Sequence, residues 1–264
     1  MKSLRESLLD DDLVEKTDKL IKNEITAFLK KNFKGAKTCR ISRKPNSDGK
    51  YEVSSTRDIY KISGIDLNSL TNGMFIWTTV DGDFVVRDCE SLKTLEGGPK
   101  EVSENFDCTN CSSLVSLKGA PEKVGGDFDC WGGHSLESLE GAPEKVGGDF
   151  DCSLCRSLKS LEGAPKEVER NFECSGCKSL TSLDGAPKEV GGGFDCSKCD
   201  KLISLEGSPE KVEWSFRCSG CKSLTSLDGA PKEVGKDFEC EDCKVKFTED
   251  DVKKVSNIKG KIYC

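Results

Sequence analysis

The sequence is poor in the residues on which many active sites and metal centres depend. It contains a single histidine, His134, so no histidine pair or histidine-rich metal site can form, and a His-based triad would rest on this one residue. It also lacks a phosphate-cradling glycine motif, because its Gly-Gly pairs at 125/126, 147/148 and 191/192 lie in the turns of a repeat. We therefore expect a protein that is not an enzyme and has neither catalytic residues nor a cofactor.

Long apolar runs are also missing. No stretch of about 18 apolar residues occurs, and the N-terminus has no apolar signal-peptide region, so we expect no membrane partner and a cytoplasmic location. In that compartment the 16 cysteines are expected to be reduced thiols rather than disulfides.

The chain carries a net charge of −7, which gives no support to general nucleic-acid binding. One segment, residues 30–44, holds basic residues and no acidic ones. A nucleic-acid contact there is an alternative hypothesis, but a solvated surface is favoured because no aromatic residues are interleaved with the charges. The basic residues of this segment are Lys30, Lys31, Lys34, Lys37, Arg40, Arg43 and Lys44.

What the sequence does contain is a repeat of 22 residues without insertion or deletion, which predicts a solenoid. Stacked coils place residues 22 apart in ladders, with strands about 4.8 Å apart. Phe, Cys, Leu and Val columns are expected to form the core, with two Leu and one Val in each coil. The phenylalanines after Phe84 are Phe106, Phe128, Phe150, Phe172, Phe194, Phe216 and Phe238, and the first cysteines of the coils are Cys108, Cys130, Cys152, Cys174, Cys196, Cys218 and Cys240.

One acidic column lies between these two ladders. In each Phe-x-Cys segment the middle residue should face outward, because side chains alternate along a strand. This column, together with Trp214, is the predicted binding surface for a protein partner. Its residues are Asp107, Asp129, Asp151, Glu173, Asp195, Arg217 and Glu239.

Two further features recur in every coil. A Gly-[Ala/Gly/Ser]-Pro step fits a corner, since Gly tolerates unusual φ and Pro removes a backbone donor. A Lys-Glu or Glu-Lys pair follows and predicts a solvated edge with ion pairs between coils, each worth about 0 to 1 kcal/mol.

The cysteines allow more than one interpretation. Six coils contain C-x-x-C, and successive pairs have zinc-site spacing, so a zinc-binding protein is an alternative function. Structural thiols are favoured, because the cysteines share the phase of Phe and Leu and because Val86 replaces one of them. Redox chemistry or disulfides form a third possibility.

Different patterns flank the repeats. Apolar spacing predicts a helix over 12–33, and β-like runs follow at 37–42, 50–54, 59–63 and 74–80. After Cys243 the period fails, Thr248 fits the N-cap of a second helix, and residues 261–264 fit a final strand. Ser3 and Glu6 have capping-box spacing, so residues 1–11 are a short helix or a docking segment.

The repeat C-x-S-L-x-S-L-x-G-A-P-x-x-V-G-G-x-F-x-C-x-x-C resembles leucine-rich-repeat-like proteins of gut bacteria and their phages, and also the treponemal-type leucine-rich repeat. The resemblance covers about residues 84–243 and implies an architecture rather than an activity. The opening MKSLRESLLDDD is similar to openings of other proteins in that group, which suits a shared docking or sorting peptide. An origin in a phage would place the chain in the host cytoplasm or on the virion.

The sequence therefore predicts a mainly β, leucine-rich-repeat-like solenoid of 22-residue coils with an N-terminal α-helix, a small β region and a C-terminal helical cap. The expected divisions are a docking segment (1–11), a helix and β cap (12–82), the solenoid (83–243) and a C-terminal cap (244–264). The predicted function is that of a non-enzymatic scaffold that binds a protein, with partner and oligomeric state left open.

Overall fold

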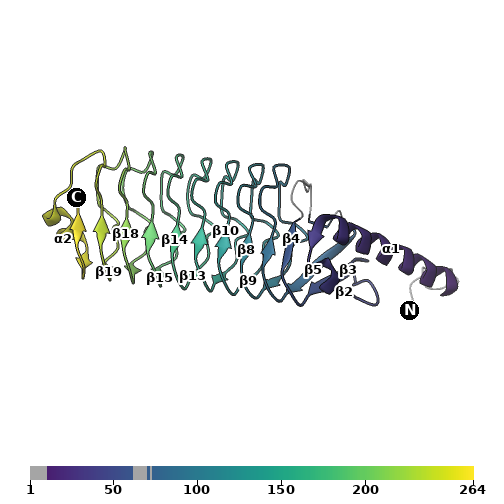
Figure 1. Ribbon diagram of the computed structural model, residues 1–264. Coiled ribbons are helices and arrows are strands. Elements are labelled where there is room, and N and C mark those ends of the chain that lie inside the picture. The colour runs from purple at the N-terminus through teal and green to yellow at the C-terminus, as the bar shows by residue number, and fades with distance from the viewer. Residues whose placement is uncertain (1–10, 62–69, 72) are drawn as a thin grey trace.

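The computed structural model describes residues 11–61, 70–71 and 73–264, and the predicted docking segment lies almost wholly outside them. These residues form a mainly β solenoid of about nine coils of about 22 residues each (Figure 1). Helix α1 (Asp11–Asn32) lies at one end of the stack and the short helix α2 (Glu249–Val255) at the other. The predicted fold class is confirmed.

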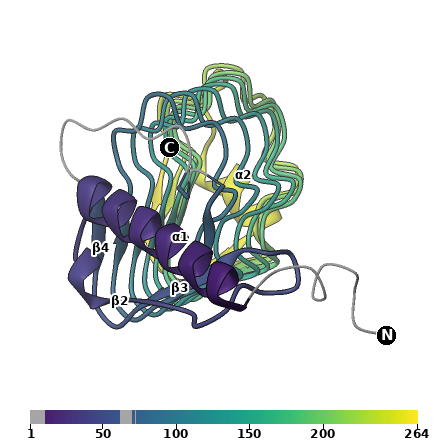
Figure 2. The same cartoon turned by 90° about the vertical axis from the view of Figure 1, so that its right-hand side faces the viewer.

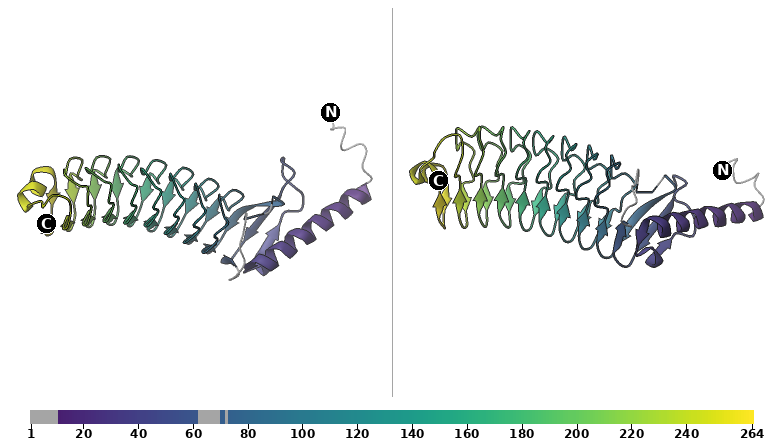
Figure 3. Two further views of the ribbon diagram at one scale, coloured as in Figure 1. Left: turned by 90° about the horizontal axis from the view of Figure 1, so that it is seen from above. Right: turned by 45° about the horizontal axis from the view of Figure 1, so that its top comes forward.

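Two parallel rows of very short strands run the length of the solenoid, as Figure 3 shows from two sides. The first row, which we call sheet A, consists of β1 (Phe33–Lys34), β4 (Ile59–Lys61), β6 (Phe84–Val85), β8 (Phe106–Asp107), β10 (Phe128–Asp129), β12 (Phe150–Asp151), β14 (Phe172–Glu173), β16 (Phe194–Asp195), β18 (Phe216–Arg217), β20 (Phe238–Glu239) and β22 (Ile262–Tyr263).

The second row, sheet B, consists of β2 (Cys39–Ile41), β3 (Tyr51–Ser55), β5 (Phe75–Val80), β7 (Glu101–Val102), β9 (Lys123–Val124), β11 (Lys145–Val146), β13 (Glu167–Val168), β15 (Glu189–Val190), β17 (Lys211–Val212), β19 (Glu233–Val234) and β21 (Asn257–Ile258). Its strands contain the charged residue that the sequence placed at a solvated edge. The prediction of an edge was therefore incomplete, because backbone pairing between coils makes this edge a second sheet.

Stacking in register produces the core. Phe128 pairs with Phe106 on one side and Phe150 on the other, and the ring centroids are 5.1 and 5.4 Å apart. Val146 occupies the equivalent inward position of sheet B, between Val124 and Val168. The Phe, Leu and Val ladders and the interior cysteines are buried, so apolar burial between coils supplies most of the stabilisation.

The corner of each coil requires glycine for two reasons. Gly119 has φ of +90°, a left-handed conformation that favours glycine, and a Cβ there would collide with the Glu96 backbone of the preceding coil. Six other glycines in the same column have φ between +83° and +97°. The predicted corner role of Gly is confirmed.

The N-terminal end is closed by α1, which crosses the first coils in the end-on view of Figure 2. Ile25, Leu29 and Phe33 are buried there, whereas Leu20, nearer the start of the helix, is 64% exposed. Strands β1 and β2 pair antiparallel with β4 and β3, while the interior strands are parallel. The four predicted β runs correspond to β2, β3, β4 and β5, although residues 62–63 lie outside the described residues.

At the C-terminal end, the predicted capping box is confirmed: the Thr248 hydroxyl accepts the Asp251 amide N–H, and the Asp251 carboxylate accepts that of Thr248. The 22-residue period fails after Cys243 as predicted, and the predicted final strand is present as β22 (Ile262–Tyr263). Strands β21 and β22 extend both sheets by one more coil, in which Ile262 occupies the Phe position 24 residues after Phe238. The interval lengthens because α2 is inserted.

Candidate interaction surface

The predicted acidic column runs along the outer side of sheet A. Each member stands directly opposite its counterpart in the next coil, so Asp129 faces Asp107 and Asp151, and Glu173 faces Asp195. The side chains are less exposed than simple alternation suggests. Asp107 is buried, Arg217 is exposed, and the rest are half-buried: Asp129, Asp151, Glu173, Asp195 and Glu239.

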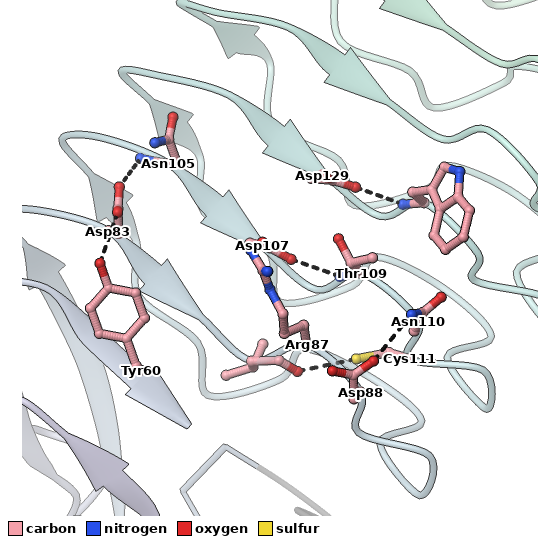
Figure 4. Close-up of polar contacts among 12 residues, drawn as sticks. Tyr60, Asp83, Arg87, Asp88, Asn105, Asp107, Thr109, Asn110, Cys111 and Asp129 are labelled. Carbon is pink, nitrogen blue, oxygen red and sulfur yellow. Dashed lines mark hydrogen bonds and ion pairs between the residues drawn. The ribbon is translucent and has the colours of Figure 1, made fainter. Parts of the chain in front are cut away.

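Half-burial follows from a local hydrogen bond. Oδ1 of Asp129 accepts the backbone N–H of Trp131 at 2.9 Å, and Oδ1 of Asp107 accepts that of Thr109 at 3.0 Å (Figure 4). Asp151 and Asp195 bind the N–H groups of Ser153 and Ser197 in the same way, at 2.7 and 2.8 Å. These contacts turn the carboxylates toward the next loop and fix their positions.

A second polar column, which the sequence analysis missed, lies immediately before each Phe. Oδ1 of Asp83 accepts the N–H of Asn105 in the next coil (Figure 4). Oδ1 of Asn105 in turn accepts the N–H of Asp127. The series continues through Asp149 and Asn171 to Gly193. The recurrence of Asp or Asn one residue before Phe was the signal that could have revealed this ladder.

Like charges accumulate along sheet A. Five successive members of the predicted column, from Asp107 to Asp195, are acidic. Burial raises the pKa of Asp129, Asp151 and Glu173, and the neighbouring carboxylates raise it further. The protein therefore holds these carboxylates in a conformation that disfavours their charge.

Arginines stand at both ends of this acidic run. Arg87 forms an ion pair with Asp107, and Nε of Arg217 lies 3.0 Å from Oε1 of Glu239. A groove of about 400 Å³ opens beside the first of these pairs, with Tyr60 on its wall. The Tyr60 hydroxyl donates to Asp83 at 3.1 Å, and burial, reinforced by that carboxylate, raises its pKa to about 12.

Sheet B presents a different charge pattern. Each repeat places one Lys and one Glu side by side, and ion pairs join successive coils, as between Lys145 and Glu167 at 3.3 Å and between Lys232 and Glu210 at 2.7 Å. Hydrogen bonds from lysines lower the pKa of Glu210 and Glu213. The predicted ion pairs between coils are present, and carboxyl pKa values here shift in the direction opposite to sheet A.

The interior cysteines are buried core residues. The thiol of Cys177 donates to the backbone carbonyl of Cys152 at 3.2 Å, and the second cysteines of the other C-x-x-C pairs contact the preceding coil in the same way. Burial raises the pKa of Cys108 and Cys152 well above the ordinary value. Within the described residues, no group of three or more His, Cys, Asp or Glu is arranged to hold a metal ion.

The remaining candidates lie elsewhere on the molecule. Trp214 is 54% exposed at the bend between the sheets, and the ammonium of Lys236 lies 3.7 Å from its ring centroid. His134 is exposed, with Nδ1 3.0 Å from the Leu154 carbonyl oxygen. The seven basic residues of 30–44 are all exposed but are spread over the end of α1, β1, the 3-10 turn Ala36–Thr38, β2 and the loop after it.

Comparison of the chain with protein families, curated proteins and solved structures found no match in any of the three. The resemblance to leucine-rich-repeat-like proteins therefore stays a prediction, whereas the solenoid itself is shown. In the part of the chain that the structure describes, no helix is both long and apolar enough to cross a bilayer.

Proposed function

We propose that this protein is a non-enzymatic scaffold that uses the acidic column of sheet A to bind a cationic segment of a partner protein. The observation that carries the proposal is the run of five in-register acidic residues from Asp107 to Asp195, in which only the first, Asp107, is paired with an arginine, Arg87. The predicted resemblance adds an expected origin in a gut bacterium or its phage, but no partner.

The run of acidic residues on sheet A opposes folding in the free protein. Like charges directly opposite each other in a sheet are destabilising, and partial burial increases the effect. Sheet B shows that the same repeat accommodates both signs of charge on one strand position: Lys211 stands opposite Glu189 and Glu233, although Lys123 stands opposite Lys145. A bound cationic segment would offset the repulsion on sheet A, and this supports a binding role for the column.

The dimensions of the column restrict the partner. Four steps of about 4.8 Å spread the five carboxylates over about 19 Å, which is the length of a helix of about 13 residues. Lysines three or four residues apart on such a helix are about 5 to 6 Å apart, so each can pair with the carboxylate of a successive coil. We therefore expect a lysine-rich helical segment to bind better than a short basic peptide.

The test uses a labelled 13-residue helical peptide with lysines at i and i+4, and fluorescence anisotropy as the readout. In the double variant Asp151→Asn/Asp195→Asn the hydrogen bonds to Ser153 and Ser197 can persist, because Asn keeps an Oδ1 acceptor. We expect about a tenfold loss of affinity, equivalent to about 1.4 kcal/mol.

The matched control is Glu167→Gln/Glu189→Gln on sheet B, which changes the net charge by the same amount. We expect this control to lose less than about twofold in affinity, since its charges lie on the other sheet. An equal loss in both double variants would show that only net charge matters and would contradict a specific surface on sheet A.

A further inference from the structure

Three thiols gather in the last coils: Cys240, Cys243 and Cys264. Strand β22 pairs with β20, so Cys264 continues the ladder of first cysteines and lies beside Cys240. The Cys240 amide donates to the Tyr263 carbonyl at 2.8 Å, which fixes this alignment. The sulfur atoms of Cys240 and Cys264 are 3.2 Å apart.

This pair differs from the interior rungs in accessibility. Cys152, Cys174 and Cys196 are completely buried, because coils cover them on both sides. Cys264 is partly exposed, and in the described part of the chain β22 is the last strand of sheet A. A small oxidant can therefore reach the terminal sulfur, while Cys240 behind it is only 2% exposed.

We propose that Cys240 and Cys264 form an intrachain disulfide with a low-molecular-weight disulfide as the oxidant. The Cys264 thiolate attacks the small disulfide, forming a mixed disulfide and releasing one small thiolate. Cys240 then loses its proton and attacks the Cys264 sulfur, releasing the second small thiolate. Two protein S–H bonds are lost, one S–S bond forms, and two electrons reduce the small disulfide to two thiols.

The new bond has a structural consequence. It closes a loop that contains α2 and β21 and ties β22 covalently to β20. The coil of β21 and β22, which within the described residues contacts one neighbouring coil, would then be prevented from fraying. The inference concerns this end alone and does not depend on the acidic column of sheet A.

The experiment uses full-length protein carrying Cys243→Ser. Cys243 is removed because it is partly exposed and its pKa is lowered to about 7, chiefly by a hydrogen bond with Cys218, so it would compete for the oxidant. After incubation with glutathione disulfide, we expect the loss of two free thiols and a cross-link between tryptic peptides 237–244 and 262–264. The urea midpoint should rise and fall back after reduction.

Two variants complete the test. In Cys243→Ser/Cys264→Ser the cross-link and the shift in urea midpoint should disappear. In Cys39→Ser/Cys243→Ser, which removes a partly exposed thiol at the other end, both should remain. The proposal is overturned if the native parent loses no thiols, if other cysteines are joined, or if the bond links two chains.

Discussion

The two sheets share one backbone repeat but distribute charge in opposite ways. On sheet B the strand position carries both Lys and Glu, ion pairs join several neighbouring coils, and the pKa of Glu210 and of Glu213 is lowered by lysines. On sheet A the carboxylates stack on one another, and the pKa of Asp129 and of Asp151 is raised.

This difference shows that the stacking of the coils does not depend on which charges their outer faces carry. The backbone register is the same on both sheets, so the stacking of coils does not require an acidic column. Sheet B carries both signs of charge and little net charge, while the acidic column of sheet A creates a field that attracts cations. The binding role that we propose for sheet A would therefore come with a loss of stability in the free protein.

The largest expected effect concerns the core beneath the two sheets. Phe150→Ala should lower the free energy of unfolding by about 3 to 5 kcal/mol, because Phe150 packs between Phe128 and Phe172. Val146→Ala removes the equivalent of two methylenes from sheet B and should cost about 2 kcal/mol. Urea unfolding of both variants measures the difference. A larger loss of stability for Val146→Ala would contradict the expectation that the Phe ladder contributes more to stability than the Val ladder.

The second prediction concerns pH. Because the pKa values of Asp129, Asp151 and Glu173 are raised, the folded protein binds more protons than the unfolded chain at pH values just above about 4. Their contribution to stability is thus lost as pH rises from about 4 through the raised pKa values. The variant Asp129→Asn/Asp151→Asn/Glu173→Gln should become more stable than the parent by roughly 1 to 2 kcal/mol near pH 7.

Urea unfolding between pH 4 and 7 measures this difference. The comparison variant is Glu210→Gln/Glu213→Gln, whose residues flank strand β17 of sheet B. Their lowered pKa values give the opposite sign: the stabilising contribution is present at neutral pH and is lost on acidification. Parallel pH profiles for the two variants would refute the contrast between the sheets.

The smallest predicted effect isolates one charge on each sheet. Asp151→Asn should stabilise the protein by roughly 0.2 to 1 kcal/mol, because it removes like-charge repulsion and keeps an acceptor for Ser153. Glu167→Gln should destabilise it by about 0 to 1 kcal/mol, because it removes the ion pair with Lys145. Thermal denaturation at low salt checks the opposite signs, and half a molar NaCl should shrink both changes.

Much of the architecture could be predicted because a strict period turns single residues into ladders. Phe150 recurs as Phe128 and Phe172, so its burial against them follows from the repeat alone. Sheet B was missed because two-residue strands such as Lys145–Val146 have no internal alternation and are recognisable only by pairing with the next coil. Strand β21 was missed for the same reason, in a coil that the insertion of α2 had lengthened.

The candidate site was less predictable than the fold. Alternation places Asp151 on the outer side of sheet A, but its half-burial depends on the hydrogen bond to Ser153 and hence on the path of the next loop. The Asp and Asn ladder before Phe depends on the stagger between coils, which the sequence does not specify. The close approach of Cys264 to Cys240 likewise requires knowing that β22 resumes the register after 24 residues.

The in-register stacking of coils also fixes the length of the solenoid in steps of one coil. Loss or duplication of one 22-residue unit would preserve every ladder and would shift one end of the molecule relative to the other by about 4.8 Å. The separation between its two closed ends can therefore change only in whole steps. Gain or loss of one repeat in the gene would therefore change the separation between the two ends while the ladders between coils stay in register.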